Sequence, residues 1–371
     1  HWNWVLRNNR CCIERKEVLI VKREVYIIFA GLVLCGLIMT SMNAVAAVEW
    51  GPKADMPTQR CFLSTSVLDG KIYAIAGSLD LAATVKTVEV YDPVSNTWEK
   101  KADMKFARQE LSTSVVNGKI HAIGGFRNFR LWFSIVEEYD PATDTWTRKA
   151  GMPTKRAGLS TSVVNGKLYA IGGSTDDRED LVDQKLFATV EEYDPATDTW
   201  TAKADMPTAR TGLSTSVVNG KIYAIGGGKL EGDVNVAFPT VEEYDPATDT
   251  WTKKTDMPTE RYTQTCVVNG RIYAIGGSPD LNAGLATVEE YNPATDTWTR
   301  KEDMVTPDLP TTRDAHALSV VNGGVYVIGG TQSLGAAACL PTVEHAFPQG
   351  FSVSPHGRLT TTWGEIKQRR Q

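Results

Sequence analysis

Two short β-prone runs separated by an Asn-Gly pair form the clearest hydrophobic pattern in this chain. Residues 159–164 (Leu-Ser-Thr-Ser-Val-Val) are small and β-branched, and residues 167–171 (Lys-Leu-Tyr-Ala-Ile) continue the pattern after Asn165-Gly166. Both residues of an Asn-Gly pair tolerate the positive φ of a type I′ turn, so the pattern predicts a β-hairpin. The same junction recurs at Asp69-Gly70, Asn117-Gly118, Asn219-Gly220, Asn269-Gly270 and Asn322-Gly323.

The hairpin is the first half of a longer repeated unit. A Gly-Gly pair follows it at 172–173, then a variable loop, a third β-prone run at 189–193, an Asp-Pro turn at 194–198 and a fourth run that contains Trp200. The corresponding tryptophans are Trp50, Trp98, Trp146, Trp200, Trp251 and Trp298, spaced by 48, 48, 54, 51 and 47 residues. Copies of a four-stranded antiparallel unit at this spacing predict an all-β fold in which the copies stand around a ring as a β-propeller.

The phase of the repeat predicts six blades and the way in which the ring closes. Six first halves are present, but the first tryptophan run precedes the first of them, and the sixth unit has no tryptophan at the expected distance after 341–345. We therefore expect residues 48–53 to pair into the last blade as its outer strand. The alternative assigns that strand to residues 360–363. Residues 47–350 are expected to form the six-bladed propeller.

The repeat resembles that of the kelch family. The Gly-Gly pair after the second strand, the tyrosine of the third and the tryptophan of the fourth match the kelch motif over roughly residues 48–348. The resemblance implies a β-propeller of the bacterial secreted type, with one mouth of the ring as the binding face. We expect a monomeric binding module that recognises a protein or a glycan through that face, without catalysis.

The first 46 residues have a different composition. Basic residues precede an apolar run at 25–39, and small residues with an Ala44-x-Ala46 pair follow it, which is the order of a secretory signal peptide. The apolar run is shorter than the roughly 20 residues that cross a bilayer. We expect cleavage and a secreted, periplasmic or cell-surface protein. An uncleaved anchor is the alternative, and the only case in which a membrane partner is expected. The tail at 351–371 matches no motif.

The net charge bears on the class of partner, and the cysteine content bears on disulfide bonding. The leader carries six basic and three acidic residues, so its removal changes the formal net charge from −5 to −8. This balance disfavours nucleic acid as a partner. Cys61, Cys266 and Cys339 remain after the leader, an odd number at unmatched repeat positions. We expect them to be small buried apolar residues and not a disulfide framework.

Six arginines open the innermost strands and are the first candidate ligand contacts. They could form a basic ring at one mouth, and the kelch resemblance implies that arginines at this position sometimes contact acidic ligands. The alternative is structural pairing with acids such as Asp55, Asp103, Asp205 or Glu191. The six are Arg60, Arg108, Arg156, Arg210, Arg261 and Arg313.

The loop of blade 2 is the second candidate, because it carries aromatic and basic residues where other blades have small or polar ones. Arginine beside aromatic residues is typical of binding hot spots. The alternative is that these side chains fold over a neighbouring loop. The candidates are Phe126, Arg127, Phe129, Arg130 and Trp132.

Departures from the repeat suggest one catalytic alternative. Glu110 and His316 interrupt the innermost strands of blades 2 and 6, and blade 5 is one residue shorter between Arg261 and Asn269, which should shift its register. The kelch resemblance includes periplasmic sialic-acid mutarotases, in which Glu110 beside Arg108 would act on a carboxylated sugar. No hydrolase, phosphate-binding or metal-binding motif is present. We expect no metal and no cofactor.

Overall fold

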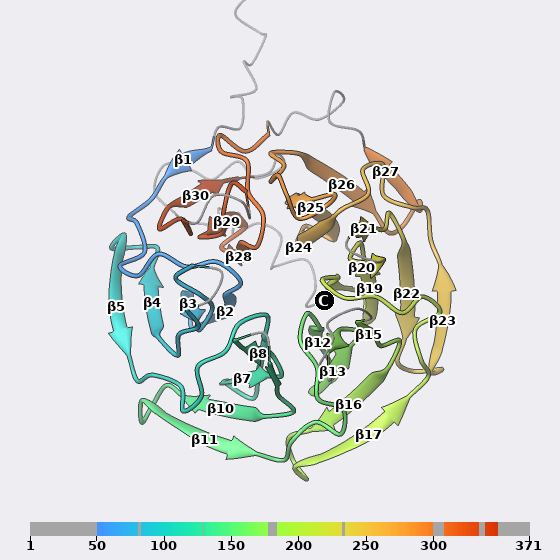
Figure 1. Cartoon of the computed structure of the whole chain (residues 1–371), viewed down its shortest axis with the longest axis horizontal. Helices are drawn as coiled ribbons and strands as arrows, with labels where there is room; N and C mark the ends of the chain where they lie inside the picture. Colours follow the sequence, from blue (N-terminus) through green and yellow to red (C-terminus); the bar gives the residue numbers. More distant parts are fainter. Residues whose placement is uncertain are drawn as a thin grey trace, which may run out of the picture. The chain divides into compact units, whose positions relative to one another are not determined.

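Six four-stranded antiparallel sheets stand around a common axis, one behind the next along the chain (Figure 1). The computed structural model describes residues 50–80, 83–128, 130–176, 184–231, 234–299, 308–333 and 338–347. The predicted six-bladed propeller of four-stranded blades is confirmed. The predicted leader, the tail and the alternative closing strand at 360–363 lie outside the described residues and stay predictions.

In each of the first three blades the strands run from the axis outwards in chain order. Blade 1 comprises β2 (Ser64–Leu68), β3 (Lys71–Ile75), β4 (Val88–Asp92) and β5 (Thr97–Lys101). Blade 2 comprises β6 (Ser112–Val116), β7 (Lys119–Ile123), β10 (Val136–Asp140) and β11 (Thr145–Lys149). Blade 3 comprises β12 (Ser160–Val164), β13 (Lys167–Ile171), β16 (Val190–Asp194) and β17 (Thr199–Lys203).

The last three blades follow the same order, except that blade 6 takes its outer strand from the start of the described chain. Blade 4 comprises β18 (Ser214–Val218), β19 (Lys221–Ile225), β22 (Val241–Asp245) and β23 (Thr250–Lys253). Blade 5 comprises β24 (Tyr262–Val268), β25 (Arg271–Ser278), β26 (Val288–Asn292) and β27 (Thr297–Thr299). Blade 6 comprises β28 (Ala317–Val321), β29 (Gly324–Ile328), β30 (Val343–Ala346) and β1 (Gly51–Pro52).

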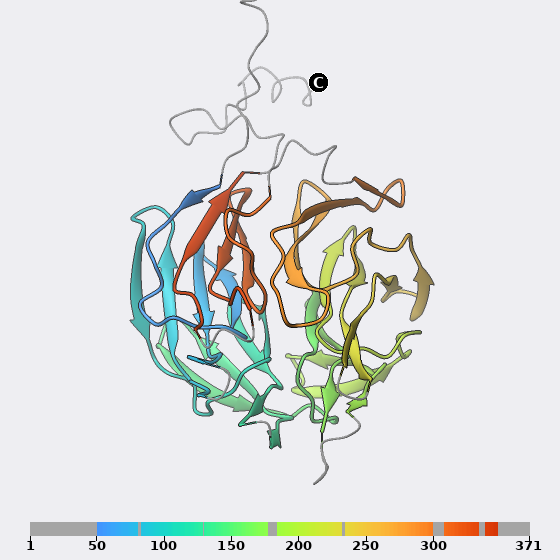
Figure 2. The same cartoon turned by 45° about the horizontal axis from the view of Figure 1, so that its top comes forward.

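The Asn-Gly turns have the predicted geometry. Asn165 and Gly166 have φ of 51° and 74°, and Val164 lies opposite Lys167 across the turn. This is the type I′ conformation, whose twist matches that of the two strands. The Asn-Gly turns and the Asp-Pro turns lie at one end of the strands, and the Gly-Gly pairs lie at the other end. Figure 2 shows the strands running between these two faces of the ring.

Two contacts close the ring. Strand β1 pairs antiparallel with β30, with Gly51 opposite His345, which confirms the predicted closure by the N-terminal strand. The second contact is a disulfide between Cys61 at the start of blade 1 and Cys339 in blade 6. The expectation that these cysteines are unpaired was wrong, because residues 278 apart in sequence meet only when the ring closes. Cys266 is free and buried, as expected.

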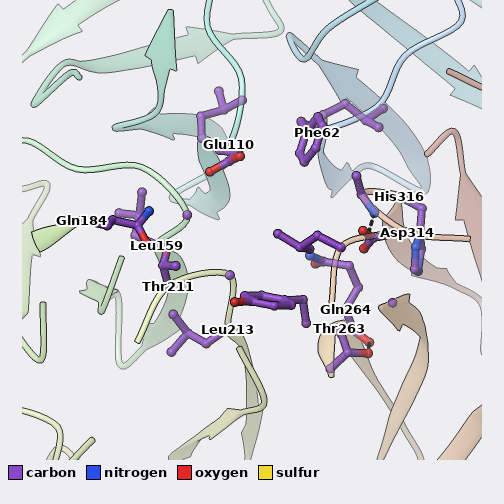
Figure 3. A pocket seen from close by; sticks show the side chains of 18 residues that line it. Phe62, Glu110, Leu159, Gln184, Thr211, Leu213, Thr263, Gln264, Asp314 and His316 are labelled. Atoms are coloured by element: carbon purple, nitrogen blue, oxygen red, sulfur yellow. Dashed lines mark hydrogen bonds between the residues drawn. The ribbon is translucent and has the colours of Figure 1, made fainter. Parts of the chain in front are cut away.

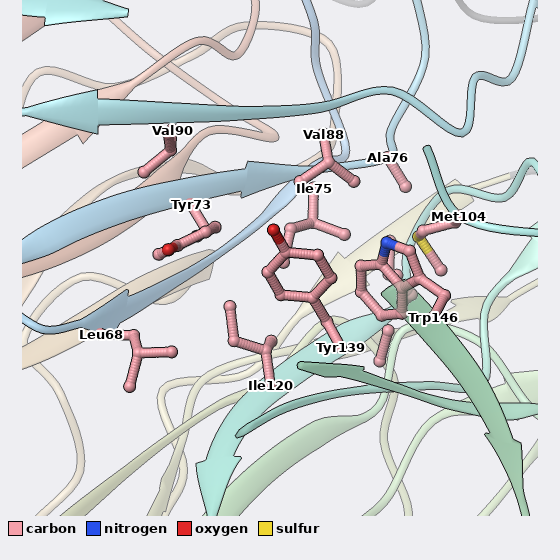
Figure 4. Packing of buried hydrophobic residues seen from close by; sticks show 12 residues of the cluster. Leu68, Tyr73, Ile75, Ala76, Val88, Val90, Met104, Ile120, Tyr139 and Trp146 are labelled. Carbon is pink, nitrogen blue, oxygen red and sulfur yellow. The ribbon is translucent and has the colours of Figure 1, made fainter. Parts of the chain in front are cut away.

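The apolar core lies between adjacent blades. Tyr73, Ile75 and Val88 of blade 1 pack against Ile120 and Tyr139 of blade 2 (Figure 4). Blades 6 and 1 share a cluster of the same kind, so the ring has no open edge. Because each blade buries its apolar face only against its neighbours, the ring is the smallest stable unit.

The repeated tryptophan also joins neighbouring blades. The Trp200 ring lies 5.0 Å from that of Tyr193 on the adjacent strand, and its Nε1 donates to the carbonyl of Ala150, in the segment that arrives from blade 2. The Tyr193 hydroxyl donates to Asp198 Oδ1, which also accepts from the Ala150 amide. One turn therefore fixes the preceding connection, as predicted for scaffold residues.

Among the described residues, three blades carry an additional hairpin between their second and third strands. Blade 2 has β8 (Phe126–Arg127) and β9 (Leu131–Trp132), and blade 3 has β14 (Ser174–Thr175) and β15 (Lys185–Leu186). Blade 4 has β20 (Gly228–Glu231) and β21 (Val234–Ala237). The expected register shift in blade 5 is confirmed between Tyr262 and Gln264. In the described part of the chain no helix is long and apolar enough to span a membrane.

Candidate functional site

A cavity of about 190 Å³ lies at the mouth of the ring where the innermost strands begin (Figure 3). All six blades contribute to it, and most of the contributed side chains differ from blade to blade. Its lining includes Phe62, Glu110, Gly158, Gln184, Thr211, Tyr262, Asp314 and His316. We call this cavity the mouth pocket.

The rim of the mouth pocket is a repeated backbone feature. Two residues after the repeated arginine, five blades place a residue in the left-handed region: Phe62, Glu110, Gly158, Gly212 and Ala315, with φ from 51° to 62°. These residues are joined in series by backbone hydrogen bonds. The Phe62 amide donates to Ala315, Glu110 to Phe62, Gly158 to Glu110 and Gly212 to Gly158. The rim is therefore held by the backbone, and its side chains are free to vary.

Blade 5 lacks this rim residue because it is one residue shorter, and Tyr262 takes the vacant space. The Tyr262 side chain is 6% exposed, and its hydroxyl donates to the carbonyl of Lys229 in the hairpin of blade 4. A Cβ on Gly212 would lie 2.7 Å from the Tyr262 ring, and one on Gly228 would lie 2.6 Å from its hydroxyl. Two glycines therefore make room for the aromatic ring.

Glu110 is one of two carboxyl groups in the mouth pocket. Burial, and secondarily the charge of Asp314, raises the pKa of Glu110 to about 7. A carboxyl with this pKa exists in both protonation states near neutral pH. It can therefore donate a hydrogen bond to a ligand or accept one from it.

Asp314 and His316 come from blade 6. Burial raises the pKa of Asp314 to about 6, although the Ala315 amide donates to its Oδ1 at 2.8 Å. Oδ2 is buried and has no hydrogen-bond partner among the described residues. Burial also lowers the pKa of His316 to about 3, so this imidazole is neutral at pH 7.

The six arginines lie outside the mouth pocket. Every one has a side chain that is 0% exposed and forms an ion pair with the first glutamate of its own blade's third strand. The pairs are Arg60–Glu89, Arg108–Glu137, Arg156–Glu191, Arg210–Glu242, Arg261–Glu289 and Arg313–Glu344, at 2.6–3.2 Å. The expectation of an exposed basic ring was wrong, and ligand contacts by these residues have no geometric support.

The strand register explains the pairing. Ala170 lies opposite Glu191 in the sheet, and Arg156 donates to the Ala170 carbonyl and forms an ion pair with Glu191. Thr154 donates to the other carboxylate oxygen of Glu191. Each arginine therefore joins the connecting segment to two strands of its blade. Burial lowers the pKa of Arg156 to about 10, so the group remains charged at neutral pH.

Arg108 does not accompany Glu110. Its guanidinium lies against Glu137 at 3.2 Å and donates to the Ala122 carbonyl, inside the blade. Glu110, two residues later, faces the mouth pocket. The pair predicted for a mutarotase is therefore not formed. Both residues precede β6, and Glu110 has a left-handed backbone with φ of 52°, so the alternation of an extended strand does not hold between them.

The aromatic loop of blade 2 is partly folded over. Phe126 is 4% exposed and stacks on Trp132 at 5.8 Å, so this side chain is packed within its own hairpin. Trp132 is half-buried, whereas Arg127 and Arg130 are exposed. Leu131 is 53% exposed. Phe129 lies outside the described residues. The predicted binding role of this hairpin stays a prediction.

The axis below the mouth pocket is lined by hydroxyl groups. Serine and threonine on neighbouring innermost strands are hydrogen-bonded to one another, as in Ser112 with Thr161 at 2.8 Å and Ser160 with Thr215 at 2.9 Å. Because these hydroxyls have partners across the blade boundary, we assign them to the scaffold. No group of three or more metal-ligating side chains gathers within the described ranges.

The sequence reasoning identified Glu110 and His316 but missed Phe62, Tyr262 and Asp314. All three follow the repeated arginine by one or two residues, at positions where the blades differ from one another. That variation was visible in the sequence. Only the fold shows that both positions border the mouth.

Fold and site together define a closed six-bladed β-propeller with a pocket at one mouth. A model of the KLHDC2/KLHL20/DRC7 Kelch-repeats domain matches residues 149–330, and the Kelch motif matches residues 59–105 and 107–153. The chain belongs to the kelch-repeat family.

Individual relatives match over short stretches. The chain is 36% identical over 87 residues to Kelch repeat and BTB domain-containing protein 12 of Homo sapiens, which is 22% of this chain and 13% of that protein. It is 41% identical over 85 residues to Kelch-like protein terF of Aspergillus terreus, 21% of this chain and 18% of that protein. These matches thus span less than a fifth of either relative's length.

Among solved structures, that of YjhT has a similar fold. It superposes with a TM-score of 0.65 over 78% of this chain and 95% of its own, at 16% sequence identity. At this identity the likeness extends to the propeller fold alone.

Proposed function

We propose that this chain is a binding module that takes part of a protein or glycan ligand into the mouth pocket. The observation that carries the proposal is the contrast between a rim backbone that is repeated in five blades and rim side chains that range from glycine to phenylalanine. A pocket with a few polar groups among apolar and aromatic walls is the usual form of a ligand site.

The hairpins of blades 2, 3 and 4 would extend the binding face. Their first strands bridge to the residues that follow the repeated arginines, as in Gln109 with Phe126 and Thr211 with Gly228. Exposed Leu131 and Val234, at 53% and 61%, lie in two of these hairpins. A larger ligand would contact the hairpins while one of its groups enters the pocket.

We also propose that the protein is secreted, periplasmic or displayed at the cell surface. The Cys61–Cys339 disulfide supports this, because disulfides persist in oxidising compartments. The signal-peptide pattern of residues 1–46 points the same way.

A screen of the purified chain against glycan and peptide arrays tests the binding role. Phe62→Ala and Trp132→Ala separate the mouth pocket from the blade 2 hairpin. Val94→Ser is the matched control, because Val94 is 93% exposed in the turn between β4 and β5, at the opposite face. We expect Phe62→Ala to weaken binding at least tenfold and Val94→Ser to leave it unchanged. Equal binding by Phe62→Ala and wild type would remove the pocket from the proposal.

An acid–base enzyme is the second candidate, favoured by the Glu110 pKa of about 7. Proton transfer in sugar ring opening is most efficient with a group of this pKa. With Arg108 held inside its blade, a neutral sugar fits better than sialic acid. NMR measurement of mutarotation rates for glucose and sialic acid tests it. An unchanged rate with both sugars, or equal acceleration by Glu110→Gln, would rule this role out.

A further inference from the structure

The groups that can carry a charge in the mouth pocket at neutral pH are all acidic. Two carboxyl groups, Glu110 and Asp314, line it from blades 2 and 6, and Figure 3 shows them on different sides of the pocket. A third acid, Asp280, acts electrostatically on Asp314. The described lining contains neither lysine nor arginine, and its one histidine, His316, is neutral.

One of these carboxyl groups is incompletely satisfied. Asp314 is 5% exposed, and its Oδ2 has no hydrogen-bond partner among the described residues. Burying a carboxylate without a partner is costly, and a cation supplied from outside removes that cost. The scaffold provides the contrast, because the first glutamate of each third strand is paired with an arginine of its own blade.

Aromatic rings supply the remaining walls. Phe62 and Tyr262 both line the mouth pocket, and Tyr262 is fixed by its hydrogen bond to Lys229. The face of an aromatic ring attracts a cation within about 6 Å. Carboxylates with aromatic rings form a chemical environment that favours positive charge and disfavours an anionic sugar.

We propose that the mouth pocket binds a compact organic cation, a primary ammonium or guanidinium group, through Glu110, Asp314 and the two aromatic rings. This inference rests on the proposed binding function and specifies the ligand group that enters the pocket. Lysine and arginine side chains of a protein carry such groups, as do free amines.

Cation binding should depend on pH with a definite sign. The groups that face Glu110 and Asp314 are each other, Asp280, Tyr262 and His316. Among these only the two carboxyls change charge between pH 5 and pH 8, because His316 stays neutral. The ionised fraction of a carboxyl with a pKa of about 7 falls by about 100-fold from pH 8 to pH 5, while an alkyl ammonium stays charged. Affinity should therefore fall on acidification.

Isothermal titration calorimetry on the full chain tests the proposal. The probes are butylamine, the methylamides of N-acetyl-lysine and N-acetyl-arginine, glucose and sialic acid, each at pH 8 and pH 5. We expect the three cations to bind about 100-fold more tightly at pH 8, and glucose and sialic acid not to bind. Binding of the amino-acid probes without butylamine would identify a protein side chain as the source of the cation.

Two variants and one matched control complete the experiment. Glu110→Gln and Asp314→Asn should each weaken cation binding at least tenfold, and Asp92→Asn, the same change at the opposite face, should leave it unaltered. If Asp314→Asn does not fold, Glu110→Gln and the pH dependence decide. Cation affinity that is independent of pH, or equal in wild type and Glu110→Gln, would overturn the proposal, and so would preferential binding of sialic acid.

The outcome also separates this inference from the function on which it rests. Suppose that array ligands without a cationic group bind the wild-type chain but not Phe62→Ala. The binding function would then stand, and the inference that the pocket takes a cation would be wrong. Failure of every array ligand and every cation to bind would remove both.

Discussion

The blade interiors and the mouth use the same repeat in opposite ways. In the blade interiors all six copies keep the same ion pair, with Arg–Glu distances of 2.6–3.2 Å. At the rim, two residues after each arginine, the side chains range from glycine to phenylalanine, yet φ stays between 51° and 62° in five blades. Repetition of the backbone therefore allows side chains to diverge at one place without loss of the ring.

The rim is also where the chain accepts unfavourable backbone conformations. Blades 3 and 4 have glycine there, which is suited to positive φ. Blades 1, 2 and 6 have Phe62, Glu110 and Ala315, and each such residue costs roughly 1–2 kcal/mol in the left-handed region. Two of these three side chains, Phe62 and Glu110, contribute a ring and a carboxyl group to the mouth pocket. The cost falls where side-chain chemistry differs from the repeat, as is common at functional sites.

The largest effect should come from breaking a buried ion pair of the scaffold. Arg210→Ala leaves Glu242 buried, 2% exposed and without its cation, and should lower the free energy of unfolding by about 3–5 kcal/mol. Urea denaturation measures this. The paired variant Arg210→Met/Glu242→Leu removes both charges and should recover most of the loss. A single variant as stable as wild type would contradict the scaffold role of the six arginines.

The disulfide should have the next largest effect. Cys61→Ala/Cys339→Ala opens the covalent tie between blades 1 and 6, and should lower the free energy of unfolding by about 2–5 kcal/mol. Cys266→Ala is the control for loss of a buried cysteine alone. Thermal unfolding that matches in the two variants would mean that β1–β30 pairing is sufficient to close the ring.

Replacing one of the repeated tryptophans should lower stability less than removing the disulfide. Trp200→Phe keeps the stacking on Tyr193 but removes the hydrogen bond from Nε1 to Ala150. We expect a loss of about 1–2 kcal/mol, from one partly buried hydrogen bond and a small cavity. Chemical denaturation should give the same loss for Trp251→Phe, whose Nε1 donates to Ala204. Unequal losses would show that the blades are not energetically equivalent.

Features repeated in every blade were predictable from the sequence. The Asn-Gly turns, the tryptophan spacing and the early position of Trp50 were sufficient to predict the strands, the blade number and the closure. They depend on local chemistry, and six copies make a local signal strong.

Features that depend on contacts between distant segments were not predictable. Cys61 and Cys339 meet only across the closed ring, and whether each arginine faces its own blade or the mouth depends on strand register. Tyr262 gains its place because a residue is missing from blade 5 and because Gly212 and Gly228 leave space. The shortened blade was visible in the sequence, but the side chain that fills the space was not.

The smallest expected effect is also the one most specific to the mouth. Because the pKa of Glu110 is raised to about 7 from an ordinary value of 4.5, its protonated form favours the folded state. Stability contributed by that proton is complete below pH 4.5 and is lost as the pH rises through 7. The glutamine in Glu110→Gln is neutral at every pH. The melting temperature of this variant should equal that of wild type at pH 4.5 and exceed it at pH 8. We expect a rise of about 2–4 °C, for roughly 1 kcal/mol, since the side chain opens onto the pocket and solvent reduces the full effect.

Glu99→Gln, an exposed acid of the outer strand β5, is the control and should show no such difference. A melting difference for Glu110→Gln that is the same at both pH values would mean that this carboxyl titrates as it does in the unfolded chain, and that the mouth is no more desolvated than the outer surface of the ring.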